Sequence, residues 1–317
     1  MNSLEKIKEA TAFLPEKIRF LVSAIDARFA SKIKEIRMKS TFPISVVSTD
    51  GNLFLKSNGS LTKNPREDGV FITGKNDMDE AVRRLCDFSF HSFQNEMKNG
   101  YITVRGGHRV GICATAVTDA MGNLTAVKNV SSINIRISRE VLGCADELIY
   151  SIYRNDIKSV LIVGEPSSGK TTLLRDAAFR LSSEEFGFLR VCIVDERKEI
   201  ASTYDGYATN KIGVSCDVLD GYPKADGMMI ALRAISPSII VCDEIGDEKD
   251  VYAIQKVANA GVKLLATIHS NSFSQLLKRP QFIRLMDTGA FDVAVVLKGR
   301  QAPCRIKEIV PLKKYWR

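Results

Sequence analysis

The first 138 residues alternate between helix-like and strand-like patterns of apolar positions. Apolar residues recur with a period near 3.6 within residues 4–38 and 76–96, and this spacing predicts a helical region in each range. Strands are expected where apolar and β-branched residues lie between turn signals, at residues 43–47, 53–55, 101–105, 110–117 and 124–137. Together these elements predict a small α+β domain over residues 1–138.

The pattern changes near residue 145 to short apolar strands that alternate with helices. The expected strands lie at residues 159–163, 189–194, 238–242, 263–268, 292–297 and 306–310, and the expected helices begin at Lys170, near Gly227, at Asp247 and near Ser272. Short β-branched strands between helices are typical of a mostly parallel sheet that is covered on both faces. Residues 139–317 are therefore expected to form an α/β domain.

A glycine-rich loop between the strand at 159–163 and the helix at Lys170 carries the strongest chemical signal. It matches the pattern G-x-x-x-x-G-K-[ST]. The candidate nucleotide-binding residues are Gly164, Glu165, Pro166, Ser167, Ser168, Gly169, Lys170, Thr171 and Thr172. Backbone N–H groups and the helix N-terminus of such a loop attract phosphate, so Lys170 is expected at the β- and γ-phosphates of ATP and the Thr171 hydroxyl at Mg²⁺. The predicted second domain is thus a RecA-like P-loop NTPase core.

Two apolar strands end in carboxylates that suit the hydrolysis of a phosphoanhydride. Asp243 and Glu244 follow the strand at 238–242. Asp243 is expected to hold Mg²⁺ through water, and Glu244 to orient and deprotonate the attacking water. A surface Asp-Glu turn is the alternative. Glu196, after the strand at 189–194, is a second candidate base, with a solvated charge run as its alternative.

His269 and Arg233 are further candidate catalytic residues. His269 follows the strand at 263–268, and it would face the γ-phosphate if that strand lies between the phosphate-loop strand and the Asp243 strand. An ordinary structural histidine is the alternative. Arg233 stands ten residues before Asp243 and is either a subunit-contact arginine or an ordinary salt-bridge partner.

Composition, charge and cysteines exclude several classes of protein. The 317-residue chain is 45% apolar and 26% charged, which excludes a collagenous, disulfide-scaffold or wholly disordered protein. The net charge of +8 divides equally between residues 1–150 and 151–317, which argues against a dedicated nucleic-acid domain. No apolar run reaches 18 residues and the first residues lack the pattern of an export signal, so we expect neither a membrane-spanning helix nor a leader. Seven scattered cysteines without a CxxC pair favour buried free thiols in a reducing cytoplasm.

The order of these motifs resembles that of the secretion ATPases of type II export systems and type IV pili. Those proteins carry a phosphate loop, an acidic box, a Leu-Arg element and a histidine box, which correspond here to residues 164–172, 195–199, 232–237 and 267–269. The resemblance implies hydrolysis of ATP with Mg²⁺ in a homo-oligomer, usually a hexameric ring. The acidic box here lacks the proline that many of these ATPases have, and Asp-Glu replaces Gly-Glu after the later strand. These departures leave open whether Glu244 and Glu196 share the role of base.

Segments of the first domain extend the resemblance to the family of stage III sporulation protein AA. They are residues 100–111 and 132–140, with Glu35-Ile36-Arg37 ahead of Pro43-Ile44. With them the resemblance runs over nearly the full length. It implies a cytoplasmic ATPase, peripheral to the membrane through partners, that serves a secretion-like channel between mother cell and forespore. The implied partners are the other membrane proteins of the stage III sporulation channel complex, and no stable nucleic-acid partner is implied.

The ring-forming relatives also suggest roles for residues outside the second domain's core. Arg136 and Arg139 are candidates to reach nucleotide phosphates, with hairpin-surface charges as the alternative. The turn at residues 106–109 is either a partner contact or a hairpin tip that needs its glycines. Two other functions stay open beside a ring-forming ATPase, namely a nucleic-acid-dependent P-loop ATPase and a nucleotide switch that does not hydrolyse ATP.

Overall fold

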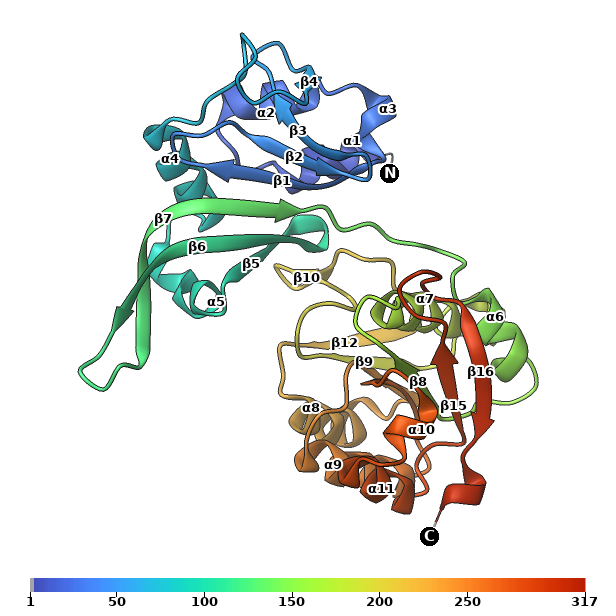
Figure 1. The fold of residues 1–317 in the computed structure, drawn as a ribbon. Helices are drawn as coiled ribbons and strands as arrows, with labels where there is room; N and C mark the ends of the chain where they lie inside the picture. Colours follow the sequence, from blue (N-terminus) through green and yellow to red (C-terminus); the bar gives the residue numbers. More distant parts are fainter. Residues whose placement is uncertain (1–2, 317) are drawn as a thin grey trace. The chain divides into compact units, whose positions relative to one another are not determined.

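The computed structural model describes residues 3–316 and divides the chain into two compact units, Met1–Arg139 and Glu140–Arg317 (Figure 1). No helix within residues 3–316 combines the length and the apolar character that a bilayer crossing requires. Each unit contains one large sheet, and the two sheets differ in the direction of their strands.

The first unit is built on a seven-stranded antiparallel sheet. The strands lie in the order β4 (Leu61–Thr62), β3 (Gly51–Leu55), β2 (Ser45–Ser48), β1 (Ile33–Lys39), β7 (Leu124–Arg136), β6 (His108–Thr118) and β5 (Tyr101–Val104). The helices are α1 (Ser3–Ala10), α2 (Glu16–Ser23), α3 (Ala27–Ala30), α4 (Lys75–Leu85) and α5 (Gln94–Lys98), with 3₁₀ turns at Phe90–Phe93 and Arg105–Gly107. Ile36 and Ile135 of the sheet share one core with Ile18 and Met78 of the helices.

Two of the expected helices of this unit are wrong in part. The range 4–38 contains three short helices and then strand β1, because Ile33–Lys39 pairs with β2 on one side and with β7 on the other. The range 76–96 breaks after α4, where Asp87 and Phe88 take positive φ values of 45° and 60°. Strands are present at each of the five ranges where they were expected.

The turn at residues 106–109 has a structural role in this unit. His108 is fully buried, and its Nδ1 accepts a hydrogen bond from Ser138 N at 2.9 Å. His108 Nε2 lies 3.4 Å from Glu9 Oε2. Gly106 has a φ of +82°, and a Cβ there would lie 2.3 Å from the same oxygen of Glu9, so only glycine fits. His108 therefore ties the chain end that leaves β7 to helix α1.

The second unit is built on a seven-stranded, mostly parallel sheet. Its strands lie in the order β12 (Cys216–Asp220), β9 (Val191–Asp195), β13 (Ile239–Cys242), β14 (Lys263–His269), β8 (Val160–Gly164), β15 (Val293–Leu297) and β16 (Ile306–Pro311). Every neighbouring pair in this sheet is parallel except β15 and β16. A separate two-stranded sheet joins β10 (Thr203–Tyr204) to β11 (Tyr207–Ala208).

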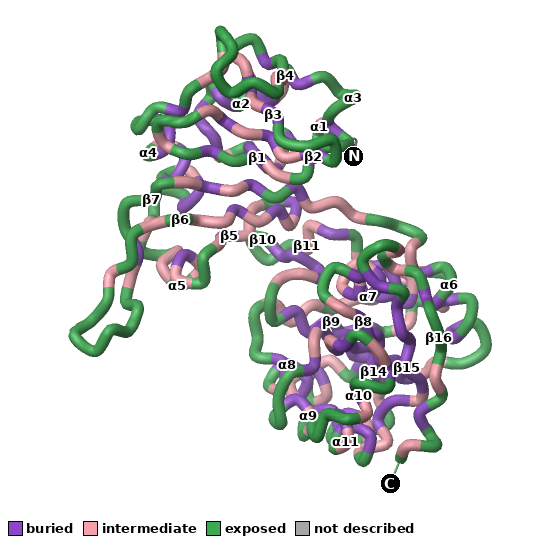
Figure 2. Tube along the Cα trace, viewed as in Figure 1, coloured by how far each residue is buried: buried purple, intermediate pink, exposed green. Residues whose placement is uncertain are grey.

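Helices cover both faces of this sheet, and the central strands are buried (Figure 2). One face packs against α7 (Lys170–Leu181), α6 (Asp146–Leu148) and the π-helical turn Ile149–Tyr153. The other packs against α8 (Lys224–Ile230), the π-helical turn Ala231–Ile235, α9 (Glu248–Asn259), α10 (Phe273–Leu276) and α11 (Pro280–Asp287). Short 3₁₀ turns lie at Glu184–Phe186 and Lys313–Tyr315.

Because the central strands of this sheet are buried on both faces, they could be predicted from apolar runs in the sequence. Strands β8, β9 and β13 are buried at every position, so their sequences are continuously apolar. The edge strand β12, with the sequence Cys-Asp-Val-Leu-Asp, is only half-buried and carries no such signal. The mostly parallel sheet with helices on both faces is confirmed, and β12 is an addition to it.

The buried state of His108 makes the stability of the first unit depend on pH. Burial lowers the pKa of His108 to about 4, although Glu9 opposes the shift. An unfolded chain takes up a proton on this ring below pH about 6.5, whereas the folded chain does not do so until about pH 4. We expect this group to remove up to about 3 kcal/mol from the free energy of unfolding as the pH falls from about 6.5 to 4.

A matched pair of variants isolates this contribution. His108→Asn keeps an acceptor for Ser138 N but does not titrate, so its unfolding free energy should fall less over this pH range. His91 is exposed, and His91→Asn should keep the wild-type slope. Urea unfolding of the full chain, followed in residues 3–139 by pulsed hydrogen exchange, measures both. Equal slopes for all three proteins would contradict the assignment.

Candidate functional site

Strand β8 lies at the point where the order of strands in the parallel sheet reverses, because later strands are added on both sides of it. The chain passes from β8 through α7 to β9 on one side, whereas β15 joins β8 on the other side. Strand β14 lies between β8 and β13, with His269 beside Gly164 and Ala266 beside Cys242. Ligands of open parallel sheets bind outside the carboxyl ends of the strands at such a point. This strand order meets the condition under which His269 lies between the phosphate loop and Asp243.

A cavity of about 340 Å³ opens at this edge of the sheet. Its lining residues are Pro166, Ser167, Gly169, Lys170, Thr171, Thr172, Arg197, Glu199, Asp243, Glu244, Thr267 and His269. Most of the phosphate loop and the two acids after β13 therefore face one space. Segments that are far apart in the sequence supply the opposing walls of this cavity.

The tip of the β15–β16 hairpin supports the phosphate loop. Cys304 N donates a hydrogen bond to Ser168 O at 2.9 Å, and Arg300 N donates to Glu165 Oε1, also at 2.9 Å. Gly169 has a φ of +89°, and a Cβ there would lie 2.5 Å from Cys304 Sγ, so this position needs glycine. Glu165 and Ser168 therefore shape the loop and are not among the residues that line the cavity, and neither is Gly164.

A series of polar contacts crosses the cavity from Lys170 to Arg197. Lys170 Nζ lies 3.0 Å from His269 Nδ1. On the other side of the ring, His269 Nε2 lies 3.3 Å from Glu244 Oε1. Arg197 Nη1 donates to the second oxygen of Glu244, Oε2, at 2.7 Å. The Glu244 carboxylate is thus held at both oxygens, by a histidine and by an arginine.

The partners of His269 determine which ring nitrogen carries its proton. An ammonium group only donates, so Nδ1 accepts from Lys170 and Nε2 donates to Glu244. Burial, helped by the charge of Lys170, lowers the pKa of His269 below its ordinary value. The ring is therefore neutral at physiological pH, and it orients both the lysine and the carboxylate.

Asp243 is buried beside Lys224, the first residue of α8. Lys224 Nζ lies 3.9 Å from Asp243 Oδ1, 3.7 Å from Asp250 Oδ2 and 3.4 Å from Glu196 Oε2. It also donates to Glu244 O at 2.7 Å. Burial raises the pKa of Asp243 to about 6, and Lys224 opposes the rise. Burial by itself would lower the pKa of Lys224, but the negative groups around it outweigh this and raise it.

Asp195 organises the loop of residues 196–202 that follows β9. Its buried carboxylate accepts hydrogen bonds from the backbone N–H groups of Glu199, Ile200, Ala201 and Ser202. Burial raises the pKa of Asp195, and these bonds oppose the rise. From helix α7, Arg175 Nε donates to Ile200 O at 3.0 Å. The first acid of the acidic box therefore holds the loop in shape and does not line the cavity.

The two candidate bases lie in different places. Glu244 lines the cavity, whereas Glu196 faces Lys224 and is not among the lining residues. Glu199, three residues after Glu196, lines the cavity.

The three candidate arginines lie outside the residues that line the cavity. Arg233 is exposed, and its Nε donates to Met229 O at 3.1 Å within the same helical segment. Arg136 is exposed at the end of β7 in the first unit. Arg139 Nη2 donates to Ala30 O at 2.7 Å within that unit, and burial lowers the pKa of Arg139.

Three residues of the site received no role of their own from the sequence. Arg197 lies within the acidic box and Thr267 within the histidine box, but neither was a candidate site residue, and no motif or spacing rule marks Lys224. Thr267 Oγ1 accepts from Glu244 N at 2.8 Å, so β14 fixes the backbone beyond the end of β13. A threonine at a strand end gives a weak signal, because threonine is common in strands.

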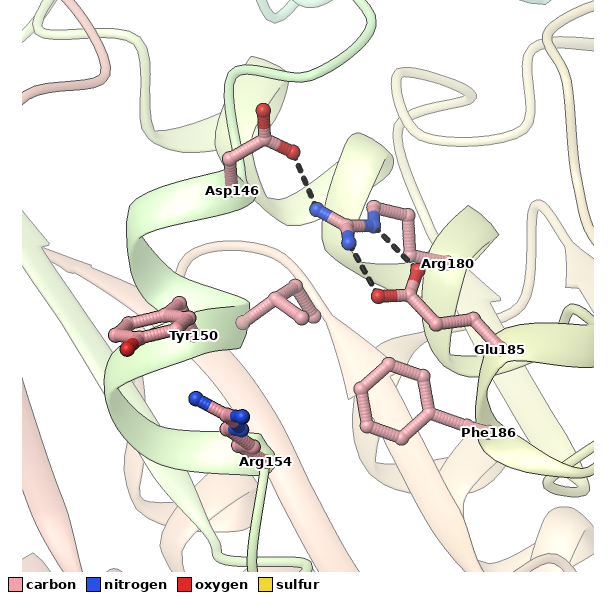
Figure 3. Close-up of a pocket in the computed structure, with 7 residues that line it drawn as sticks. Asp146, Tyr150, Arg154, Arg180, Glu185 and Phe186 are labelled. Atoms are coloured by element: carbon pink, nitrogen blue, oxygen red, sulfur yellow. Dashed lines mark hydrogen bonds and ion pairs between the residues drawn. The ribbon is translucent and has the colours of Figure 1, made fainter.

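A second cavity, of about 370 Å³, lies on the same unit at the end of α7 (Figure 3). Its arginine, Arg180, already pairs with two carboxylates, Asp146 and Glu185. Arg154 lies over the ring of Tyr150, with 5.1 Å from guanidinium carbon to ring centroid. Both carboxylates of this cavity pair with Arg180, whereas the phosphate-loop cavity gathers candidate residues from several strand ends and is therefore the better candidate site.

Comparison with known proteins identifies relatives along the whole chain. The family model described as "Sporulation stage III, protein AA" matches residues 4–314. Stage III sporulation protein AA of Bacillus subtilis (strain 168) is 35% identical over 305 residues, which are 96% of this chain and 94% of that protein.

Solved structures with a similar fold include those of an ATPase and of a pilus retraction motor. The ATPase DotB of Legionella pneumophila aligns with a TM-score of 0.55 and 16% identity over 88% of this chain and 74% of DotB. The pilus retraction motor PilT with bound ADP aligns with a TM-score of 0.57 and 14% identity over 93% of this chain and 78% of PilT. At these identities the likeness concerns the fold. Since the family model and the Bacillus relative both span almost the whole chain, this chain belongs to the stage III sporulation protein AA family.

Proposed function

We propose that this chain is an ATP hydrolase of the secretion-ATPase type, with a RecA-like P-loop core, that couples hydrolysis to the assembly or operation of a membrane secretion complex during sporulation. The observation that carries the proposal is that Lys170, Thr171, Asp243 and Glu244 line one cavity beyond the carboxyl ends of β8 and β13, the two parallel strands that flank β14. In phosphate-loop enzymes these residue types position a nucleoside triphosphate and the water that attacks it.

One buried polar atom supports the fit of a magnesium ion beside a nucleotide. Asp243 Oδ1 at the end of β13 has no hydrogen-bond partner among the described residues, and Asp243 lines the cavity. Buried polar atoms are normally satisfied, so such an atom in the wall of a cavity suits a bound ligand. Thr171 and Asp243 would hold Mg²⁺, which would neutralise charge on the β- and γ-phosphates of ATP.

The remaining chemistry belongs to residues of the chain. Lys170 supplies a fixed positive charge at the phosphates. Glu244, held by His269 on one oxygen, orients a water and accepts its proton as the bond from that water to the γ-phosphorus forms and the bond from the γ-phosphorus to the bridging oxygen breaks, so that ADP leaves. Glu196 is placed to pair with Lys224, which makes Glu244 the preferred base of the two.

The assembly and location follow from family membership as proposals. The chain acts as a homo-oligomer, a hexameric ring by analogy with the secretion ATPases, and in it Arg136 and Arg139 are candidates to approach a nucleotide of another subunit. It works in the cytoplasm and reaches the membrane through the other proteins of the stage III sporulation complex.

Lys170→Ala and Glu244→Gln test the proposed hydrolysis. Each should lower kcat for ATP by about 100-fold or more, because one removes the phosphate-binding charge and the other the base. Glu244→Gln should still bind ATP, whereas Lys170→Ala should not. Glu248→Gln, an exposed glutamate of α9, is the matched control and should hydrolyse at the wild-type rate. A wild-type rate in Glu244→Gln would remove Glu244 from the role of base, and strong stimulation by single-stranded DNA or RNA alone would favour a nucleic-acid-dependent ATPase.

Lys224 is expected to stabilise the cluster of acids on which Asp243 depends. Lys224→Met leaves Asp243 and Asp250 buried without their cation, and we expect it to lower the free energy of unfolding by about 3–5 kcal/mol. Lys224→Arg keeps the positive charge, so its free energy of unfolding should fall by less than that of Lys224→Met. Urea unfolding of the full chain measures both variants. If Lys224→Met is as stable as the wild type, these carboxylates do not need the lysine.

A further inference from the structure

Arg197 is a charged residue of the cavity to which the proposed reaction has assigned no task. Its side chain lines the same cavity as Lys170, and Arg197 Nη1 lies 2.7 Å from Glu244 Oε2. The neighbouring Lys198 turns the other way, with its Nζ at 3.2 Å from Asp220 Oδ2. The loop after β9 thus directs one of two consecutive cations toward the cavity.

The backbone that carries Arg197 is fixed from within the domain. On one side, β9 ends at Asp195, whose buried carboxylate accepts from four successive backbone N–H groups beginning at Glu199. On the other, Arg175 of α7 holds the carbonyl group of Ile200. Arg197 therefore extends from a turn whose backbone is held by hydrogen bonds on its C-terminal side, and this limits the positions that its guanidinium can reach.

A cation at the position of Arg197 would offset the repulsion between the Glu244 carboxylate and a bound γ-phosphate. If Glu244 orients the attacking water, its carboxylate lies next to the γ-phosphate, and two negative groups repel one another in a partly buried site. ADP brings no γ-phosphate and causes no such repulsion. A guanidinium has five N–H donors in a planar fork, so Arg197 can keep one bond to Glu244 and offer another to a phosphate oxygen.

We propose that Arg197 is the residue with which this chain distinguishes ATP from ADP, by contacting the γ-phosphate while it positions the Glu244 carboxylate. This inference rests on the proposed function, because it assumes that the phosphate loop binds the nucleotide. It makes recognition of the triphosphate a property of one subunit's own acidic box.

Nucleotide affinity, and not only hydrolysis, tests the proposal. Arg197→Gln should weaken binding of the β,γ-imido analogue of ATP by about tenfold or more in the presence of Mg²⁺, because a charge-assisted hydrogen bond is lost. Its affinity for ADP should stay within about twofold of the wild-type value. Arg197→Lys keeps the positive charge without the planar set of N–H donors, and its affinity for the analogue should lie between those of the wild type and of Arg197→Gln. Isothermal titration of the full-length proteins measures all of these constants.

Two further variants separate this role from loop structure and from the proposed function. Lys198→Gln, on the same turn, should leave both affinities unchanged. Lys170→Ala should lose affinity for both ADP and the analogue, and normal binding by that variant would refute the phosphate-loop assignment itself. If Lys170→Ala behaves as expected, two results for Arg197→Gln would refute the role of Arg197. One is an equal loss of affinity for ADP and for the analogue, and the other is no loss of affinity for either.

Discussion

The parallel pairing of β14 with both β8 and β13 is the constraint on which the site depends. Strands in a sheet lie about 4.8 Å apart, so the ends of three adjacent parallel strands fall within about 10 Å of one another. Here those ends carry the phosphate loop, His269 and the Asp243–Glu244 pair. The middle strand also uses Thr267 to fix the backbone at Glu244. Without that order of strands the same residues would be dispersed along the edge of the sheet.

Charge compensation around this edge explains why so many ionisable groups can be buried there. An isolated buried charge is costly, whereas a paired and hydrogen-bonded one is tolerated. Lys224 lies among three carboxylates, and Asp195 is surrounded by backbone N–H groups. These two residues do not line the cavity, but they determine where Asp243, Glu244 and the acidic loop lie. The residues that face the cavity are thus held by a second set of charges behind them.

The two units differ in how completely their elements could be predicted. The central strands of the parallel sheet are buried on both faces, so they are apolar runs that stand out in the sequence, whereas the half-buried edge strand β12 lacks this signal. In the first unit, residues 33–39 continue an apolar pattern that is compatible with a helix. They form a strand because β7, almost one hundred residues later, pairs with them. Pairing partners of that kind are not visible in a local window.

The sequence by itself located the glycine-rich loop, the acids after the apolar strands and the histidine of the next strand as candidate site residues, because each of these depends on local spacing at the end of an element. It also determined family membership, since the resemblance runs along both units. Only the tertiary structure decided which acid faces the cavity and which faces Lys224, that Arg197 joins Glu244, and that His108 is buried against Glu9. Those outcomes depend on the direction of side chains and on contacts between distant segments, and the packing of the whole domain sets both.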